Sequence, residues 1–199
     1  MKTITIAHQK GGVGKTTLAL NLAFCFADSL KVAVTDTDLQ GSINSLGSLV
    51  TGIDLVSPED VLAGKLTGYD LLVIDTPPYL TNRLTDLFAV SDYVLVPTKP
   101  GFLDAMAVRA TVSLLRESMK RKPTLQAGIV LNMVMPRTSL TQEVKELLKE
   151  YDLPVLPTMI YQRVSYARSP VTNGVFQSDD DKAKAEIQSL ATDILTQLQ

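Results

Sequence analysis

The chain has 199 residues, of which 45% are hydrophobic, and this composition is sufficient to fill the core of a single domain. Its 19 basic and 21 acidic side chains give a net charge of −2, so any surface for nucleic acid has to be local. The single cysteine, Cys25, excludes disulfides within the chain and cysteine-held metal sites, and the sequence has neither a membrane-length apolar run nor a signal-peptide core, so we expect a soluble cytoplasmic protein.

A strand, a glycine-rich loop and a helix are predicted at the start of the chain. Residues 3–7 form a short β-rich run, and residues 16–27 carry Leu, Ala and Phe at helical spacing. Between them, residues 9–17 read Gln-Lys-Gly-Gly-Val-Gly-Lys-Thr-Thr. In a P-loop, glycine amides surround phosphates, a lysine reaches the outer phosphates and a hydroxyl binds Mg²⁺. The predicted nucleotide-binding residues are therefore Gly11, Gly12, Val13, Gly14, Lys15, Thr16 and Thr17, with Thr16 also a metal ligand and Lys10 an additional lysine.

Carboxylates follow the next two predicted strands. Residues 31–35 lead into Asp36-Thr37-Asp38, and residues 71–74 lead into Asp75. Ligands of an open α/β sheet bind at the carboxyl ends of its strands, so these carboxylates are expected beside the phosphates. Asp75, after four apolar residues, has the form of a Walker B aspartate that holds Mg²⁺; a strand-end cap is the alternative interpretation.

Strand-like and helix-like segments continue to alternate along the rest of the chain. Further strands are predicted at 93–96, 127–130 and 155–160, with a long helix at 102–120. Another helix is expected to open with a Ser139-x-x-Gln142 capping box, and the final helix to start near Ser178 with Asp179, Asp180 and Asp181 at its N-terminus. This alternation predicts one α/β domain over residues 1–199, with a doubly wound, mostly parallel sheet covered by helices on both faces.

The eight residues from Lys10 to Thr17 resemble the deviant P-loop of the ParA/MinD family of ATPases, which has a lysine at each end. Residues 94–104, 128–132 and 158–176 are also similar to segments of this family, so the resemblance extends over nearly the whole chain. It is nearest to the small plasmid-type, ParF-like ParA partition proteins, because residues 161–163 differ from the Pro-Arg-Asn of larger relatives. The resemblance implies a single-domain P-loop NTPase that uses ATP and Mg²⁺.

The same resemblance assigns roles to particular residues. Asp36 and Asp38 fit the family's Asp-x-Asp switch, in which the first aspartate lies near the metal and the second positions the attacking water; Leu39 stands where proline is usual. In relatives, the lysine equivalent to Lys10 crosses a dimer interface to the nucleotide of the other subunit. Asn132 resembles a base-reading residue, and Pro136-Arg137-Thr138 follows it in the same family segment; an ordinary asparagine in a turn is the alternative. The implied catalytic residues are Lys10, Lys15 and Asp38, and the implied metal ligands are Thr16, Asp36 and Asp75.

The resemblance also implies partners. We expect a homodimer when ATP is bound, non-specific DNA binding, a nucleoid location, and a small ParB-like adaptor that stimulates hydrolysis. Two basic clusters are candidates for DNA contact: Arg116, Lys120 and Arg121 on one helix, and Arg163 with Arg168 further along the chain. The alternative interpretation is that each cluster is an ordinary solvated surface.

Other functions with the same loop stay open. The sequence leaves no room for an N-terminal helix-turn-helix extension, so sequence-specific DNA reading is not expected. It lacks the basic amphipathic helix with which MinD-type relatives attach to lipid, and one cysteine excludes a nitrogenase-like reductase. A MinD-like membrane ATPase, a P-loop biosynthetic ligase and a nucleotide-binding scaffold remain as alternatives, and neither the cargo nor the adaptor can be read from the sequence.

Overall fold

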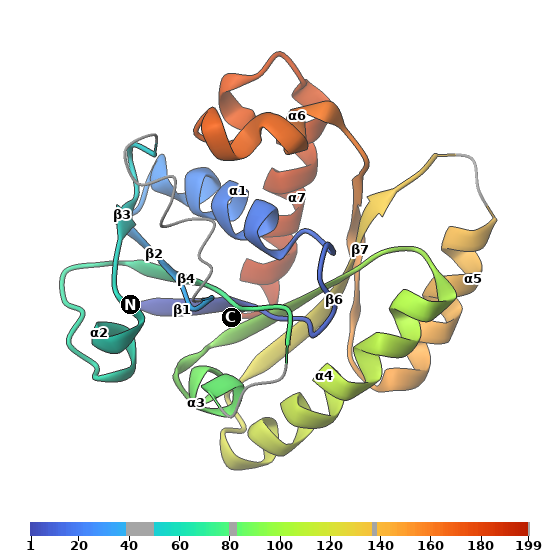
Figure 1. The fold of residues 1–199 in the computed structure, drawn as a ribbon, viewed down its shortest axis with the longest axis horizontal. Coiled ribbons are helices and arrows are strands. Elements are labelled where there is room, and N and C mark those ends of the chain that lie inside the picture. Colours follow the sequence, from blue (N-terminus) through green and yellow to red (C-terminus); the bar gives the residue numbers. More distant parts are fainter. Residues whose placement is uncertain (39–49, 80–82, 137–138, 199) are drawn as a thin grey trace.

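A seven-stranded parallel sheet forms the centre of the structure (Figure 1). The structure is a computed structural model that describes residues 1–38, 50–79, 83–136 and 139–198. The strand order is β3-β2-β4-β1-β5-β6-β7. The strands are β1 (Lys2–Ile6), β2 (Val32–Asp36), β3 (Asp54–Leu55), β4 (Leu71–Asp75), β5 (Tyr93–Thr98), β6 (Gln126–Val134) and β7 (Val155–Tyr161). The predicted fold class is confirmed, and the pairing is parallel throughout the described sheet.

Helices cover both faces of the sheet. One apolar cluster packs α1 and α7 against one face of the sheet. Two further clusters pack the helices α2, α3, α4 and α5 against the other face. Neighbouring residues of a strand point to opposite faces, so in β5 Tyr93 and Leu95 belong to the first cluster, whereas Val94 and Val96 belong to the second. The helices are α1 (Lys15–Ala27), α2 (Pro58–Leu62), α3 (Arg83–Val90), α4 (Phe102–Arg121), α5 (Leu140–Leu148), α6 (Val164–Arg168) and α7 (Asp181–Gln197), with 3₁₀ turns at Lys149–Tyr151, Ser169–Val171 and Val175–Gln177.

The register of the central strands brings the predicted carboxylates together. Asp36 at the end of β2 and Ile6 at the end of β1 are both register partners of Asp75 at the end of β4. The chain passes from β1 into α1 at this same edge, because parallel strands all end there. The P-loop, Asp36 and Asp75 therefore lie close together at the carboxyl edge of the sheet.

Two predicted helix starts differ from the structure. Ser139 lies at the start of α5 but makes no side-chain capping bond, and the Gln142 amide donates to Glu146 Oε1 at 2.9 Å instead. The capping-box prediction is therefore wrong. α7 begins at Asp181 rather than near Ser178, because Asp180 is the cap and accepts a bond from the Ala183 N–H at 3.1 Å.

A fully buried asparagine on α1 holds the segment between α6 and α7. The Asn21 amide donates to Ser169 Oγ at 2.7 Å and to the Thr17 carbonyl at 2.7 Å, and its oxygen accepts from the Val175 N–H at 2.8 Å. The helix that follows the P-loop is thus tied to a segment far along the chain.

Replacing Asn21 with alanine is expected to lower the free energy of unfolding by about 2–4 kcal/mol, because Val175 N–H and Ser169 Oγ lose buried partners. Chemical denaturation of the purified protein measures this. The matched control is Gln188→Ala, which removes an exposed amide from α7 and should change the free energy by less than about 0.5 kcal/mol. Equal effects of the two substitutions would show that the buried bonds of Asn21 contribute little.

Candidate nucleotide site

The loop between β1 and α1 has the backbone of a phosphate cradle. Gly12 and Gly14 have φ values of 70° and 89°, which glycine adopts far more readily than other residues. Gly14 is the N-cap of α1 and no side chain caps the helix there, so the first-turn N–H groups are not used by a capping side chain. A helix N-terminus of this kind is suited to binding an anion.

A cavity of about 330 Å³ brings most of the predicted site residues together. It is lined by P-loop residues, by the three aspartates of the strand ends, and by a few neighbours; the lining residues are Gly11, Gly12, Gly14, Lys15, Thr16, Thr17, Asp36, Asp38, Asp75, Thr76, Pro78 and Met133. Val13, Lys10 and Asn132 do not line it. The site predicted from three separate segments is therefore one pocket in the fold.

The Lys15 side chain is buried beside the cavity. Its residue is 7% exposed, and Nζ donates to the Lys10 carbonyl at 3.3 Å. Burial lowers the pKa of Lys15, while Asp75 and then Asp38 act in the opposite direction. The ammonium is thus held between the start of the loop and the carboxylates that a nucleotide site needs.

Thr16 and Asp75 form a set of oxygen donors that fits a hard cation. Thr16 Oγ1 donates to Asp75 Oδ2 at 2.5 Å, and the other carboxylate oxygen, Oδ1, is buried without a hydrogen-bond partner in the described part of the chain. The pKa of Asp75 is raised to about 7, chiefly by burial and also by the charge of Asp36, while the Thr16 hydrogen bond and the charge of Lys15 act in the opposite direction. An unpartnered carboxylate oxygen beside a hydroxyl and a second aspartate matches the ligands that Mg²⁺ prefers.

The described residues could supply only part of the coordination shell of a metal ion. Among the described residues, no group of three or more His, Cys, Asp or Glu side chains is placed to hold a metal ion. Mg²⁺ bound at Thr16 and Asp75 therefore needs phosphate oxygens and water as further ligands, as is usual for this ion.

Asp38 follows β2 and faces the same cavity. Its backbone N–H donates to Asp36 Oδ1 at 2.9 Å, and Thr37 binds the Asp75 carbonyl through both its N–H and its hydroxyl, at 3.0 and 2.8 Å. The first residues after β2 are thus fastened to the end of β4. Leu39, where the family usually has proline, lies outside the described residues.

Asn132 has a structural role that the sequence did not reveal. Its amide donates to the Val13 carbonyl at 2.7 Å, and its oxygen accepts from the Met133 N–H at 2.9 Å. A Cβ added to Gly14 would lie 2.3 Å from the Asn132 amide nitrogen, so the two segments are in close contact. Asn132 therefore fastens the P-loop to β6, and contact with adenine stays a prediction. Arg137 and Thr138, from the same family segment, lie outside the described residues.

Lys10 does not line the cavity and is paired with a residue of α4. Its Nζ lies 2.7 Å from Asp104 Oδ1, and its backbone N–H donates to His8 Nδ1 at 3.2 Å. Burial, and next the charge of Lys15, lower the pKa of His8 to about 4, so this imidazole is neutral near pH 7.

A third lysine, Lys99, lies close to the P-loop, with Nζ 3.9 Å from the position of a Cβ on Gly12. We did not single out His8, Lys99 or Asp104 from the sequence, although the last two fall in the segment 94–104 that resembles the family.

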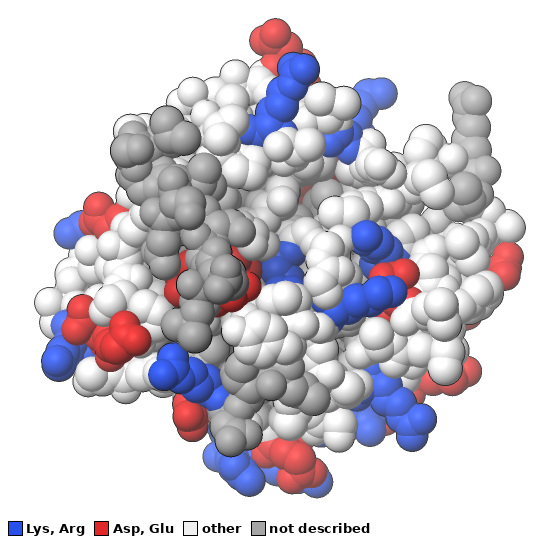
Figure 2. Space-filling view, in the orientation of Figure 1, with Lys and Arg blue, Asp and Glu red and all other residues white. Residues whose placement is uncertain are grey.

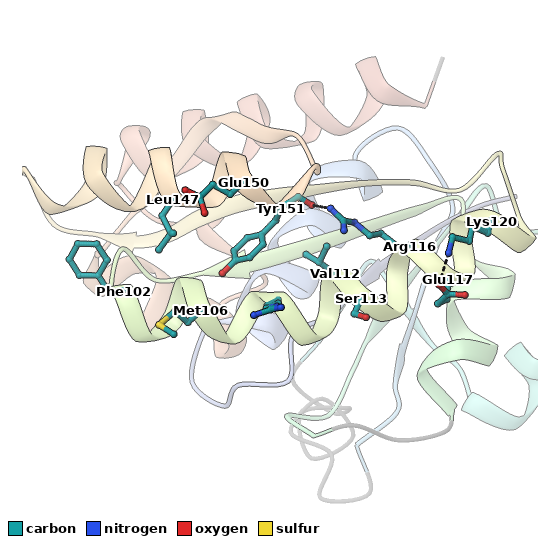
Figure 3. Close-up of a pocket in the computed structure, with 11 residues that line it drawn as sticks. Phe102, Met106, Val112, Ser113, Arg116, Glu117, Lys120, Leu147, Glu150 and Tyr151 are labelled. Atoms are coloured by element: carbon teal, nitrogen blue, oxygen red, sulfur yellow. Dashed lines mark hydrogen bonds and ion pairs between the residues drawn. The ribbon is translucent and has the colours of Figure 1, made fainter.

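The basic residues predicted on α4 are partly engaged within the chain (Figure 3). Arg116 donates to Asp152 Oδ2 at 2.6 Å and to the Tyr151 carbonyl at 2.9 Å. Lys120 pairs with Glu117 at 2.7 Å. On the face shown in Figure 2, basic and acidic side chains are interspersed over the described surface.

The second basic cluster lies at the other edge of the sheet. Arg163 pairs with Glu186, its Nε lying 3.0 Å from Oε1, and lies 3.7 Å from Asp180. It follows the carboxyl end of β7, whereas Arg121 ends α4 at the opposite edge, next to the start of β6. The structure therefore does not bring the two clusters together in one protomer. Arg121 and Arg168 are exposed, and within the described ranges neither has an ion pair.

None of the helices in the described part of the chain has the length and hydropathy that a membrane span requires.

Comparison with known proteins agrees with this geometry. The chain matches the CobQ/CobB/MinD/ParA nucleotide binding domain family over residues 4–175. It is 31% identical over 184 residues to the maintenance of carboxysome distribution protein A of Halothiobacillus neapolitanus, with 87% of this chain and 85% of that protein covered. It is 30% identical over 211 residues to the chromosome-partitioning ATPase Soj of Thermus thermophilus, with 85% of each covered.

Solved structures show the same fold. A putative plasmid partition protein from Borrelia burgdorferi, bound to AMPPNP, superposes with a TM-score of 0.79 at 25% identity, covering 98% of both chains. The family match includes the P-loop and the strand ends that line the cavity. The chain therefore belongs to the ParA/MinD family of nucleotide-binding proteins, among the ParA-type partition and positioning ATPases.

Proposed function

We propose that this protein is an ATPase that positions a cargo by cycling on and off DNA. ATP and Mg²⁺ close a homodimer, the dimer binds DNA without sequence preference on the nucleoid, and a small adaptor stimulates the hydrolysis that releases it. The observation that carries the proposal is the division of the two P-loop lysines: Lys15 lines the cavity, whereas Lys10 lies outside it. A hydrolytic site that is complete within one subunit has no use for the second lysine.

The residues of the cavity divide the work of phosphoryl transfer. The N–H groups of the loop and the Lys15 ammonium bind the phosphates, and Asp38 orients the attacking water. Thr16, Asp36 and Asp75 are the residues that would hold Mg²⁺, which neutralises charge on the phosphate oxygens when bound. This reaction depends mainly on positioning and charge neutralisation, so these side chains are a nearly sufficient set.

The exposed position of Lys10 supports a role across a dimer. Two nucleotides brought face to face place several negative charges near one another, and added cations reduce that repulsion. Lys10 is 40% exposed beside the loop, where a flexible ammonium can reach a neighbouring molecule. ATP then acts as part of the interface.

Removing each lysine separately tests this division. Lys15→Ala should weaken ATP binding about 10- to 100-fold, because the phosphates lose a charged hydrogen-bond donor. Lys10→Ala should keep the affinity of the monomer for ATP but block ATP-dependent dimers and hydrolysis. Titration calorimetry with a non-hydrolysed ATP analogue and sedimentation velocity measure the two effects, with Lys65→Ala, which removes an exposed lysine elsewhere, as control. A Lys10 variant that dimerises normally would remove the cross-subunit role.

Removing the aspartates separates water positioning from metal binding. Asp38→Ala should bind ATP and Mg²⁺ yet hydrolyse ATP about 100-fold more slowly or worse, because no side chain orients the water. Its dimer should be long-lived on DNA. Asp75→Ala should instead weaken the Mg²⁺-dependent part of nucleotide binding. Phosphate release assays and Mg²⁺ titrations measure these effects; turnover of the Asp38 variant within a few-fold of the unaltered protein would assign hydrolysis to another residue.

The DNA surface is tested with Arg121 and Arg168, the members of the two predicted basic clusters that have no ion pair within the described ranges. The ATP-bound dimer should bind random duplex DNA with an affinity that falls steeply with salt, and ATP-free protein should bind poorly. Arg168→Ala, or separately Arg121→Ala, should lower the salt slope by about one for each phosphate that the protein no longer neutralises. Lys149→Ala, an exposed cation paired with Glu146, is the control.

The same assays distinguish the alternatives. Both clusters would be excluded as DNA contacts if DNA binding were unchanged in every variant. The variants are the single replacements of Arg121 and of Arg168, the triple replacement of Arg116, Lys120 and Arg121, and the double replacement of Arg163 and Arg168. ATPase activity that is stimulated by liposomes rather than by DNA would favour a MinD-like membrane protein. Phosphorylation of a small substrate would favour a P-loop ligase.

A further inference from the structure

Lys10 is paired with a specific carboxylate inside its own subunit. Its Nζ lies 2.7 Å from Asp104 Oδ1, and the side chains are 40% and 17% exposed. Asp104 is thus the more sheltered partner, and the aspartates Asp36, Asp38 and Asp75 line the cavity from which Lys10 is absent. The ion pair keeps the Lys10 ammonium beside α4.

Asp104 lies at the N-terminus of a long helix. It lies in the first turn of α4, a helix of 20 residues whose N-cap is Gly101. Its Oδ2 lies 2.9 Å from the position of a Cβ on Gly101, so the carboxylate folds back over the N-cap, where a side chain would crowd it. The helix dipole favours a negative charge at this point. Lysine has the longer and more flexible side chain, so Lys10 is the member of the pair that can move more easily.

The loop concentrates positive charge that these carboxylates balance. Lys15 donates to the Lys10 carbonyl, and Lys99 lies at the loop tip near Gly12. Asp75 and Asp38 act on the charge of Lys15, and Asp104 is the ion-pair partner of Lys10 within the described residues. Each P-loop lysine thus has carboxylates of its own.

We propose that Asp104 is a positioning residue for Lys10, which holds the lysine on its own subunit and has to release it when the ATP-bound dimer forms. This inference rests on the proposed function, in which Lys10 reaches the nucleotide of the other subunit. Lys10 cannot bind both partners at low cost, because a phosphate brought to the ammonium also approaches the Asp104 carboxylate, and like charges repel. Closing a symmetric dimer breaks two such pairs.

The inference predicts that weakening the pair promotes dimerisation. Asp104→Asn keeps the size and shape of the side chain but removes its charge, so Lys10 should be released more easily. Partly exposed ion pairs contribute little individually, but two are broken per dimer, so the half-point of ATP-dependent dimerisation should fall about fivefold in protein concentration. The matched control is Asp181→Asn, which removes a first-turn carboxylate of α7 from its pair with Lys184 at 3.0 Å and should leave dimerisation unchanged.

A first measurement examines the pair itself in protein without ATP. Lysine ammonium groups are observed by ¹⁵N–¹H correlation spectroscopy, with the Lys10 signal assigned from its loss in Lys10→Arg. Asp104→Asn should shift the Lys10 signal and leave that of Lys184, whereas Asp181→Asn should do the reverse. A role of Asp104 confined to stabilising α4 does not single out Lys10. An unchanged Lys10 signal in Asp104→Asn would overturn the inference.

A second measurement is sedimentation velocity of the same variants with a non-hydrolysed ATP analogue and Mg²⁺. The inference is supported when Asp104→Asn forms dimers at lower protein concentration than the unaltered chain. It is overturned when the variant dimerises equally well or more weakly, because weaker dimers mean that Asp104 presents Lys10 rather than retains it. Absence of dimers in the unaltered protein would contradict the proposed function itself, whatever the spectrum of Lys10 shows.

Discussion

Balancing positive charge at one loop is the constraint on which the rest of the structure depends. Lys15 is 7% exposed at the start of α1, and a buried ammonium is costly unless carboxylates lie close to it. Those carboxylates are Asp75 at the end of β4 and Asp38 just after β2, and the register of the two strands places Asp36 opposite Asp75. A parallel sheet provides this arrangement because all its strands end at the same edge, and the buried hydrophobic faces on both sides fix the register.

The features that were predictable from the sequence are those with a local signature. The P-loop, the apolar runs of β1, β2, β4 and β5, and the long helix α4 each carry their pattern within a single segment, and the structure contains them all. β3 has two residues, and α2 and α6 have five each, which is too short for a hydrophobic period to be recognised. α3 has eight residues, and we did not single it out in the sequence.

Within the site, residues at strand ends could be predicted, but contacts between distant segments could not. Asp75 was expected beside the loop because its strand leads there. Nothing in the sequence indicates that Asn132 donates to Val13, since 119 residues separate them and the bond requires β6 to pass behind the loop. The pair between Lys10 and Asp104 depends in the same way on where α4 starts. The sequence thus predicts which charged residues lie near the P-loop, whereas the fold determines which of them form hydrogen bonds and ion pairs with one another.

Ion pairing also changes how the basic residues should be counted. The sequence offers five candidate cations for DNA, but Arg116, Lys120 and Arg163 already have carboxylate partners in the chain. A cation that leaves a carboxylate for a phosphate exchanges one favourable contact for another, so it contributes less than a free cation does. With a net charge of −2 there is no general field to compensate. Among the five candidates, Arg121 and Arg168 are the ones without a carboxylate partner in the described residues, so they would contribute most to the proposed DNA contact.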